Sequence, residues 1–386
     1  MARKLYILCF VPVVILIRLL SPVILVRTGA VFATRIGHFA LDIEVALCLD
    51  ETQSGKRKFP KKLDLFYIQD KVSNTYLLEL WKKALHFLPR NLLEPIHLLN
   101  QRLPHSTKFD FFDAQKKVGH SDLRSLDNSP VHLSFSKRDQ VRGVELLRKL
   151  GISSGEMYVC LAVRDHLFLE ETFSGLKFDY HNYRDSKIEN YQAMAEYLSS
   201  QGLKVLRMGR VTKDLFVSDC PGVIDYANSQ YRSDFADVFL FANSKFCIST
   251  STGMDALATI FRVPVGLVNV VNRVSVGLGD SVVLYQPKEM HDLETGKFLT
   301  FREKVDRNLF EVFDSQEFTK RDVLLVENHA VELQEFACEL YNLLEVKQPN
   351  LNKFNSVILE NEYEKFSLGK LSKTWLDKHP GYLSES

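Results

Sequence analysis

The stretch at residues 244–269 constrains the fold most, because it changes character three times within a short length. Residues 245–249 form an apolar run typical of a strand, and the hydroxyl-rich residues 250–253 predict a turn. Helix formers follow until Val263 and Pro264 stop them, and residues 265–271 resume an apolar, strand-like run. The pattern predicts a strand, a turn, a helix and a second strand of an α/β sheet.

The turn in this stretch is a candidate site for a phosphate. Hydroxyl groups and a glycine before a helix offer backbone N–H groups, side-chain donors and the positive end of a helix dipole. We therefore expect Thr250, Ser251, Thr252 and Gly253 to bind the diphosphate of a nucleotide. The same residues also suit an ordinary helix cap, and this stretch alone does not choose between the two.

Composition narrows the function classes. At 386 residues the chain can form two domains, and its formal net charge of +1 argues against nucleic acid as a partner. Six cysteines are scattered without a CxxC pair, which predicts reduced thiols and a cytosolic catalytic portion. The histidines lack the spacing of a metal site, so we expect neither a metal nor another cofactor.

The N-terminus carries an apolar run at residues 5–20, which Arg3 and Lys4 precede and which Pro12 and Arg18 interrupt. No small-residue cleavage site marks a signal peptide, and the run is short for a spanning helix. A monotopic or re-entrant helix on the cytoplasmic face of a membrane and a buried core helix are the remaining alternatives. We expect residues 1–22 to associate with the membrane.

A strand at residues 23–27 leads to Arg35, Gly37 and His38, just before a stretch with helical spacing of apolar positions. A glycine between a strand and a helix lets backbone and a basic side chain approach a ligand. A helix cap beside a solvated histidine is the alternative. Further on, residues 108–128 are expected to form a loop or surface excursion, with Asp110 and Asp113 as surface charges.

Polar residues follow several predicted strands of the second half of the chain. The strand at residues 157–163 ends at Arg164, and a dense polar cluster at residues 180–186 precedes a helix. The next strand ends at Arg207 and Gly209. Because parallel strands place their carboxyl ends at one edge of a sheet, we expect these residues to converge there. The same expectation covers the members of the cluster, which include Asn182, Tyr183 and Arg184.

The β-α units from residue 157 to residue 271 predict a doubly wound domain. The expected domain bounds are 1–22 for the apolar segment, 23–135 and 136–346 for two Rossmann-like domains, and 347–386 for a tail. Trp375 and Tyr382 are expected to pin that tail to the body of the protein.

Six segments together resemble a family of proteins assigned as glycosyltransferases and found with bacterial surface-polysaccharide genes. They are TRIGHFALDIEVAL, LDLFYIQDKVSNTYL, VCLAVRD, YHNYRDSKIENYQAMAEYLSSQGLKVLRMG, DYANSQYRSDFADVFL and STSTGMDALATIFRVPVGLVN. The resemblance covers residues 23–344, and the fourth segment is its most specific part. More distantly, the last segment resembles the donor site of heptosyltransferases and fucosyltransferases. The resemblance implies a GT-B-like fold, in which two Rossmann-like domains face a cleft and the second holds most of the donor.

The resemblance also implies roles. A departing diphosphate would be stabilised without a metal by Arg164, Arg184 and the 250–253 turn, with Arg35, Gly37, Asn182, Tyr183, Arg207 and Gly209 as further donor-binding candidates. Ser229 and Asp237 lie where related enzymes hold base and ribose. If transfer proceeds by direct displacement, the acceptor hydroxyl needs a general base, for which His38 is the first candidate and Asp42 the second.

Two residues are rival bases from the second domain, Asp165 and Asp185. Asp42 and Glu44 are two positions apart on the expected helix and diverge by about 200°, so at most one of them faces a cleft.

The predicted function is transfer of a sugar from a nucleotide-sugar donor to a glycan or lipid-linked acceptor in surface-polysaccharide synthesis. The alternatives are a nucleotide-sugar epimerase or pyruvyl transferase, and a non-catalytic scaffold that binds nucleotide sugars.

Overall fold

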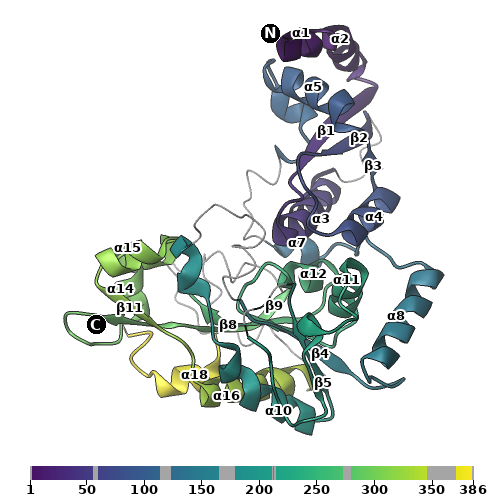
Figure 1. Cartoon of the computed structure of the whole chain (residues 1–386). Coiled ribbons are helices and arrows are strands. Elements are labelled where there is room, and N and C mark those ends of the chain that lie inside the picture. The colour runs from purple at the N-terminus through teal and green to yellow at the C-terminus, as the bar shows by residue number, and fades with distance from the viewer. Residues whose placement is uncertain are drawn as a thin grey trace. The chain divides into compact units, whose positions relative to one another are not determined.

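A computed structural model of the chain describes residues 2–54, 60–113, 123–164, 179–210, 212, 214–272, 280–345 and 371–384. Contacts between residues divide it into two compact units, Met1–Ser136 and Lys137–Ser386. Each unit has its own parallel sheet, and each is described separately below (Figure 1).

The first unit alternates helices with short strands. Its helices are α1 (Ala2–Leu8), α2 (Val11–Leu20), α3 (Ile36–Ser54), α4 (Thr75–Ala84), α5 (Arg90–Gln101), η1 (Ser106–Phe109) and α7 (Arg124–Asp127). Its strands are β1 (Ile24–Val31), β2 (Lys61–Ile68) and β3 (His86–Phe87). The strand expected at residues 23–27 is present and continues to Val31.

The sheet of the first unit is parallel, with the order β1-β2-β3 and a continuous β1–β2 register from Ile24↔Lys61 to Val31↔Ile68. Gly29 allows close packing there, because a Cβ atom at this position would lie 2.6 Å from the ring of Phe66. With three strands, this sheet is half the size of the sheet in the second unit.

The apolar N-terminus forms two short helices, α1 and α2, instead of the single helix expected. Among the described residues, no helix combines the length and the hydropathy that crossing a bilayer requires. Arg18 bonds Asn100 Oδ1 at 3.0 Å and the Pro104 carbonyl at 2.8 Å. The Arg18 guanidinium therefore ties α2 to the end of α5.

The second unit also alternates strands with helices, and it contains more of both than the first unit does. Its helices are α8 (Lys137–Lys149), η2 (Asp179–Arg184), η3 (Ile188–Tyr191), α10 (Gln192–Ser200), η4 (Tyr226–Asn228), α11 (Asp234–Ala242), α12 (Asp255–Ile260), α14 (Phe301–Asp306), η5 (Leu309–Glu311), α15 (Ser315–Lys320), α16 (Ala330–Glu345) and α18 (Lys373–Lys378). Its strands are β4 (Tyr158–Ala162), β5 (Lys204–Met208), β6 (Val223–Ile224), β7 (Cys247–Ser249), β8 (Val265–Val270), β9 (Val282–Pro287), β10 (Glu289–Asp292) and β11 (Val323–Val326).

Six of these strands form one parallel sheet with the order β6-β5-β4-β7-β8-β9. In chain order this is the 3-2-1-4-5-6 arrangement of dinucleotide-binding domains. Helices α10 and α16 cover one face of the sheet, and α11 and α12 cover the other (Figure 1). The prediction of a doubly wound parallel domain is confirmed for this unit, and the strand order reverses between β4 and β7.

The C-terminal helix α18 packs on α16, and both Trp375 and Tyr382 are buried. The expectation that these two aromatic residues pin the end of the chain is confirmed. Glu289 adds a polar clasp, since it bonds His379 Nε2 at 3.0 Å and His291 Nε2 at 2.7 Å. The His379 ring also stacks on Trp375, with ring centroids 4.1 Å apart.

The clasp predicts a pH-dependent stability. The hydrogen bond from His379, followed by that from His291, lowers the pKa of Glu289 from 4.5 to about 2. Burial lowers the pKa of His379, but its bonds to Glu289 and to the Trp375 carbonyl outweigh burial and raise it above 6.5. The contribution of Glu289 is therefore lost as pH falls from 4.5 to 2, and that of His379 is lost as pH rises through its elevated pKa.

We expect Glu289→Gln to lower the free energy of unfolding by about 2 kcal/mol between pH 4.5 and pH 6.5, with a smaller difference on either side. Urea unfolding across this pH range measures the effect. The control is Glu317→Gln, which removes an exposed pair with Lys320 and should change little. A difference that does not vary with pH would contradict the clasp.

Candidate functional site

The second unit brings its candidate residues together where the strand order reverses. Arg164 follows β4, and Thr250 follows the neighbouring strand β7. The Arg164 N–H donates to Thr250 Oγ1 at 2.9 Å, and the Thr250 N–H donates to the Ala162 carbonyl at 3.1 Å. Open parallel sheets bind their ligands outside the carboxyl ends of the strands at such a reversal. The two strand ends thus form one edge, as the sequence predicts.

The turn from Thr250 to Gly253 differs from the expectation in one respect. The N–H groups of Thr252, Gly253 and Met254 donate to the side chains of Ser249, Asp255 and Thr252 at 3.3, 2.8 and 3.1 Å. The expectation that the turn offers its amides to a ligand is therefore wrong for these three groups, because hydroxyl and carboxylate side chains of residues 249–255 accept their hydrogen bonds.

Two arginines lie at this turn. Arg184 donates to the Ser251 carbonyl, and Arg164 Nε lies 3.4 Å from Asp185 Oδ1. The Ser186 N–H donates to the Arg164 carbonyl at 3.1 Å, which joins the polar cluster at 180–186 to the end of β4. The fold therefore assembles Arg164, Arg184 and the hydroxyl-rich turn at one sheet edge, although they come from three separate parts of the sequence.

Buried polar side chains hold the polar cluster in place. Lys288 donates to the carbonyls of Tyr183 and Asp185 at 3.2 and 2.7 Å, and burial lowers its pKa. Asn269 donates to Ser186 Oγ at 3.1 Å and to Tyr191 OH at 2.9 Å. Lys288 and Asn269 were not among the predicted site residues. Their signal in the sequence is a polar residue within the apolar run 265–271 and another directly after the apolar run 282–287.

Two other predicted donor residues, Arg207 and Tyr183, have buried side chains that contact other parts of the fold. Arg207 is buried and pairs with Asp225 at 3.2 Å. Tyr183 is buried in a small hydrophobic core with Phe318, and its N–H donates to Ser315 Oγ at 2.9 Å. The burial of both side chains argues that they maintain the fold around the site.

The remaining donor candidates are spread out. Gly209 follows β5, where a Cβ atom would lie 2.8 Å from Thr212, and Asn182 is exposed.

Ser229 Oγ accepts the Tyr231 N–H at 3.3 Å. Asp237 accepts from Tyr226 OH at 2.7 Å and from Arg232 at 3.2 Å, and burial raises its pKa to about 6. These hydrogen bonds tie Ser229 and Asp237 to neighbouring residues of their own segment. The rival base Asp165 lies outside the described residues.

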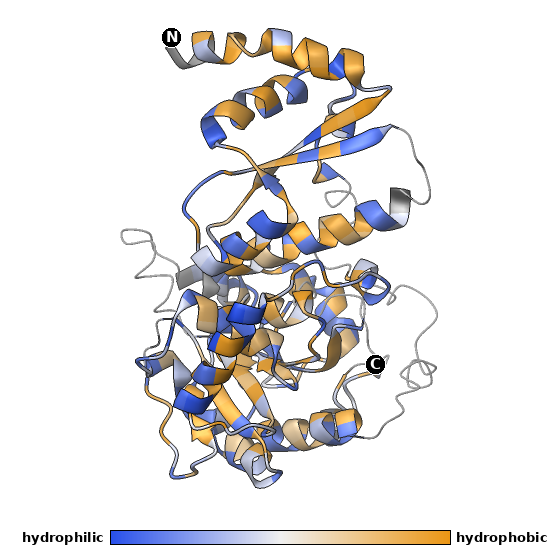
Figure 2. Ribbon diagram, turned by 90° about the vertical axis from the view of Figure 1, so that its right-hand side faces the viewer, coloured by the Kyte–Doolittle hydropathy of each residue, from blue (hydrophilic) through white to orange (hydrophobic). Residues whose placement is uncertain are grey.

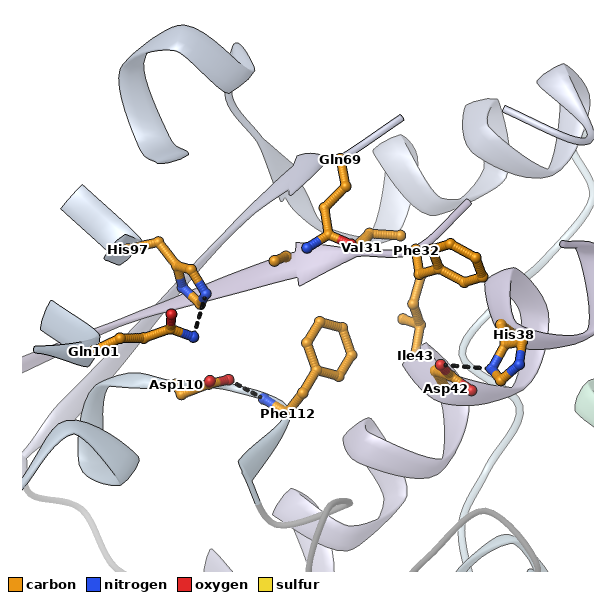
Figure 3. A pocket seen from close by; sticks show the side chains of 11 residues that line it. Val31, Phe32, His38, Asp42, Ile43, Gln69, His97, Gln101, Asp110 and Phe112 are labelled. Atoms are coloured by element: carbon orange, nitrogen blue, oxygen red, sulfur yellow. Dashed lines mark hydrogen bonds and ion pairs between the residues drawn. The ribbon is translucent and has the colours of Figure 1, made fainter. Parts of the chain in front are cut away.

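The first unit contains a cavity of about 260 Å³ at the carboxyl ends of β1 and β2 (Figure 3). Helices α3 and α5 and the segment after η1 close its other sides. The cavity is lined by Ala30, Val31, Phe32, His38, Asp42, Ile43, Gln69, His97, Gln101, Asp110 and Phe112. The ends of two parallel strands therefore contribute to this cavity, and His38 and Asp42, the two predicted bases, line it.

His38 and Asp42 form a pair on the first turns of α3. The distance from His38 Nδ1 to Asp42 Oδ2 is 3.3 Å, and the His38 ring packs edge to face on Phe32 (Figure 3). With 42% of its side chain exposed, His38 remains accessible to a substrate. A carboxylate at Nδ1 orients the imidazole so that Nε2 can accept a proton.

The neighbouring side chains of α3 divide between its two faces. Asp42 lines the cavity, whereas Glu44 is fully buried against His132, which confirms that at most one of the two carboxylates faces a cavity. Arg35 is exposed just before the helix, and Gly37 is in its first turn. Neither Arg35 nor Gly37 lines the cavity.

Two residues of the cavity were not among the predicted site residues. His97 is buried between Thr28 Oγ1 at 2.8 Å and Gln101 Nε2 at 2.9 Å. Because the Gln101 amide donates to Nε2, the His97 proton lies on Nδ1 and is donated to Thr28. Asp110 lines the cavity and accepts the Phe112 N–H at 2.9 Å.

The expectation of a surface excursion here is wrong for residues 109–111. Phe109 and Phe111 are buried, because the segment bridges β1 through Thr28↔Asp110. Alternation of aromatic and acidic residues in FDFFD was the available signal.

Comparison with protein-family models finds no match, and comparison with curated proteins finds none either. Solved structures give matches. One is a glycosyl transferase family 9 protein from Veillonella parvula, with 9% identity and a TM-score of 0.45 over 82% of this chain and 97% of that chain. Another is the E. coli ADP-heptose LPS heptosyltransferase II, with 12% identity and a TM-score of 0.36 over 62% and 84% of the two chains.

A third match is the E. coli heptosyltransferase WaaC with ADP, with 12% identity and a TM-score of 0.32 over 68% of this chain and 93% of that chain. The two E. coli proteins are heptosyltransferases, the kind of protein that the last of the six segments distantly resembles. At these identities and TM-scores the likeness carries no assignment of activity, and the function proposed below rests on the chain's own residues.

Proposed function

We propose that this protein is a glycosyltransferase that moves a sugar from a nucleotide-sugar donor to a glycan or lipid-linked acceptor in surface-polysaccharide synthesis. The observation that carries the proposal is the assembly of Arg164, Arg184 and the Thr250–Gly253 turn at the point where the strand order reverses. This is where α/β sheets bind nucleotides.

Donor cleavage leaves negative charge on the departing diphosphate. Two guanidinium groups and several hydroxyls offer planar, charge-assisted donors for phosphate oxygens, and they act without a metal ion in this proposal. Asp185 keeps Arg164 in place through their 3.4 Å contact, and the Ser251 carbonyl does the same for Arg184. The role of these groups is to bind and stabilise the leaving group.

The acceptor half of the reaction is assigned to the cavity of the first unit. His38 would remove the proton from the acceptor hydroxyl through Nε2, while Asp42 orients the ring and stabilises the imidazolium. His97 does not suit this task, because both of its ring nitrogens are already bonded to Thr28 and Gln101.

The arginines provide the first test. We expect Arg164→Ala and Arg184→Ala each to reduce turnover about 100-fold, because each removes one donor to the developing diphosphate charge. The assay follows release of nucleoside diphosphate from a panel of sugar nucleotides in the presence of a membrane lipid extract. The control is Arg148→Ala on the exposed side of α8, which should retain full activity. Unchanged turnover in folded Arg184→Ala protein would refute the phosphate assignment.

The same assay separates the rival functions. A transferase releases nucleoside diphosphate only when acceptor is present. An epimerase converts or hydrolyses the sugar nucleotide without acceptor, a pyruvyl transferase does not consume it as a donor, and a scaffold binds it without turnover. A sugar nucleotide that raises the melting temperature identifies the donor, because ligand binding stabilises the native state.

The base provides a second test. We expect His38→Ala to reduce kcat about 1000-fold and Asp42→Asn to reduce it less, with the donor KM unchanged, because these groups act on the acceptor proton. His86→Ala, at an exposed position on β3, is the matched control and should retain full activity. An unchanged kcat in folded His38→Ala protein would assign the base elsewhere.

We also propose that α1 and α2 bind the cytoplasmic surface of a membrane, where a lipid-linked acceptor would reside. Figure 2 shows that hydrophobic residues dominate the two helices at the N-terminus. Several of their large apolar side chains are exposed, among them Leu16 at 56% and Leu19 at 72%. Apolar side chains on a helix that is too short to span a bilayer suit insertion into its interface.

Vesicle sedimentation provides the third test. Leu16→Asp together with Leu19→Asp should reduce partitioning onto anionic phospholipid vesicles at least tenfold, because two apolar groups are replaced by charges. The matched control is Leu215→Asp together with Val217→Asp, at positions that are 67% and 71% exposed in the second unit. Equal loss in both double variants, or in neither, would contradict a membrane-binding surface on α2.

A further inference from the structure

Three metal-ligating side chains meet behind the cavity of the first unit. Glu44 and Cys48 lie one turn apart on α3 and are fully buried, and His132 approaches them from the segment after α7. Their ligand atoms all lie within 4.8 Å of one another, and Glu44 Oε2 is 3.1 Å from His132 Nδ1. The cluster is separate from His38 and Asp42, which line the cavity.

The three side chains are the three ligand types of zinc in proteins: a thiolate, an imidazole and a carboxylate. Zinc bonds of about 2.0–2.3 Å place tetrahedral ligand atoms roughly 3.3–3.8 Å apart. The atoms of this cluster need to move by no more than about 1 Å to meet that geometry. Side-chain rotation can supply a movement of this size.

A second observation favours a ligand role for His132. Its other ring nitrogen, Nε2, lies 3.2 Å from Glu51 Oε1. Metal-binding histidines usually present one nitrogen to the ion and donate the other N–H to a carboxylate, which fixes the ring. Here Nδ1 is directed at Glu44 and Nε2 at Glu51, which is that arrangement.

The burial of the cluster adds an electrostatic argument. A fully buried carboxylate requires a compensating positive charge, and Glu44 has the facing imidazole as its ion-pair partner. A divalent ion would supply that charge to Glu44 and at the same time to a Cys48 thiolate. The cluster also lies against a hydrophobic group that includes Val45, Leu123 and Leu126, which shields it from water.

We propose that Glu44, Cys48 and His132 supply three of the four ligands of a divalent ion of the zinc type, with Glu51 as the positioning residue for His132. The ion replaces the protons of the Cys48 thiol and of His132 Nδ1, which pass to solvent. Its role is structural: it joins α3 to the segment after α7, and so holds the helix that carries His38. This inference is independent of the glycosyltransferase proposal, because it concerns metal content and stability.

Cobalt substitution of the full chain tests the inference directly. Protein treated with a chelator is titrated with Zn²⁺ or Co²⁺ and passed through gel filtration. We expect one ion per chain to be retained, a sulfur-to-cobalt charge-transfer band with tetrahedral visible bands, and a melting temperature several degrees higher. Cobalt bound without a sulfur band, or no retained ion, would overturn the proposal. This readout needs no variant.

Variants then assign the ligands. Cys48→Ser and His132→Gln should weaken Co²⁺ binding at least 100-fold, and Glu51→Gln about tenfold, since removing an outer-shell partner typically costs that much. Cys160→Ser, which alters a buried cysteine of the second unit, is the control and should leave the cobalt spectrum unchanged. Unaltered binding in Cys48→Ser would show that the ion is held elsewhere.

Among the described residues one other cluster has metal-ligand chemistry, formed by Glu289, Glu332 and His379. It contains no sulfur, so the charge-transfer band distinguishes the two. An ion that gives no such band and is lost in Glu289→Gln would count against the Glu44 cluster.

Discussion

The pairing of β4 with β7 is the constraint on which the second unit depends. Because these strands are parallel and adjacent while the chain between them forms β5, β6 and α11, the sheet grows in opposite directions from this point. The carboxyl ends of β4 and β7 therefore lie side by side. At such a reversal the helices that follow the two strands pack on opposite faces of the sheet, so no helix lies between the two strand ends. The bond from the Arg164 amide to Thr250 Oγ1 closes this junction, and the candidate donor residues are arranged around it.

Buried polar groups make that junction rigid. Asn269 on β8 bonds a side chain of the 180–186 cluster, and Lys288, directly after β9, bonds two of its backbone carbonyls. Contacts with the sheet therefore hold the cluster in place. Each of these groups is buried and satisfied by hydrogen bonds, which makes the arrangement specific. A site built in this way presents Arg184 in a defined position before any ligand arrives.

In the first unit a single helix has two chemical faces. One side of α3 places His38 and Asp42 in the cavity, and the other buries Glu44 and Cys48 against His132. Positions two apart point in nearly opposite directions on a helix, so a reactive face and a buried polar anchor can share a few residues. Whatever fixes the anchored face also fixes the direction of the reactive one.

The sequence by itself determined the local elements and the sheet class, because hydrophobic periodicity and turn residues act within a few positions of the chain. It also pointed to Arg164, Arg184 and His38, since polar residues at the ends of apolar strands share an edge in a parallel sheet. Tertiary structure alone decided which of these residues are available. Arg207 pairs with Asp225, the Gly253 amide bonds to Asp255, and Asp110 and His97 line the cavity. Those outcomes depend on contacts between residues far apart in the chain, and no local pattern encodes which partner each side chain meets.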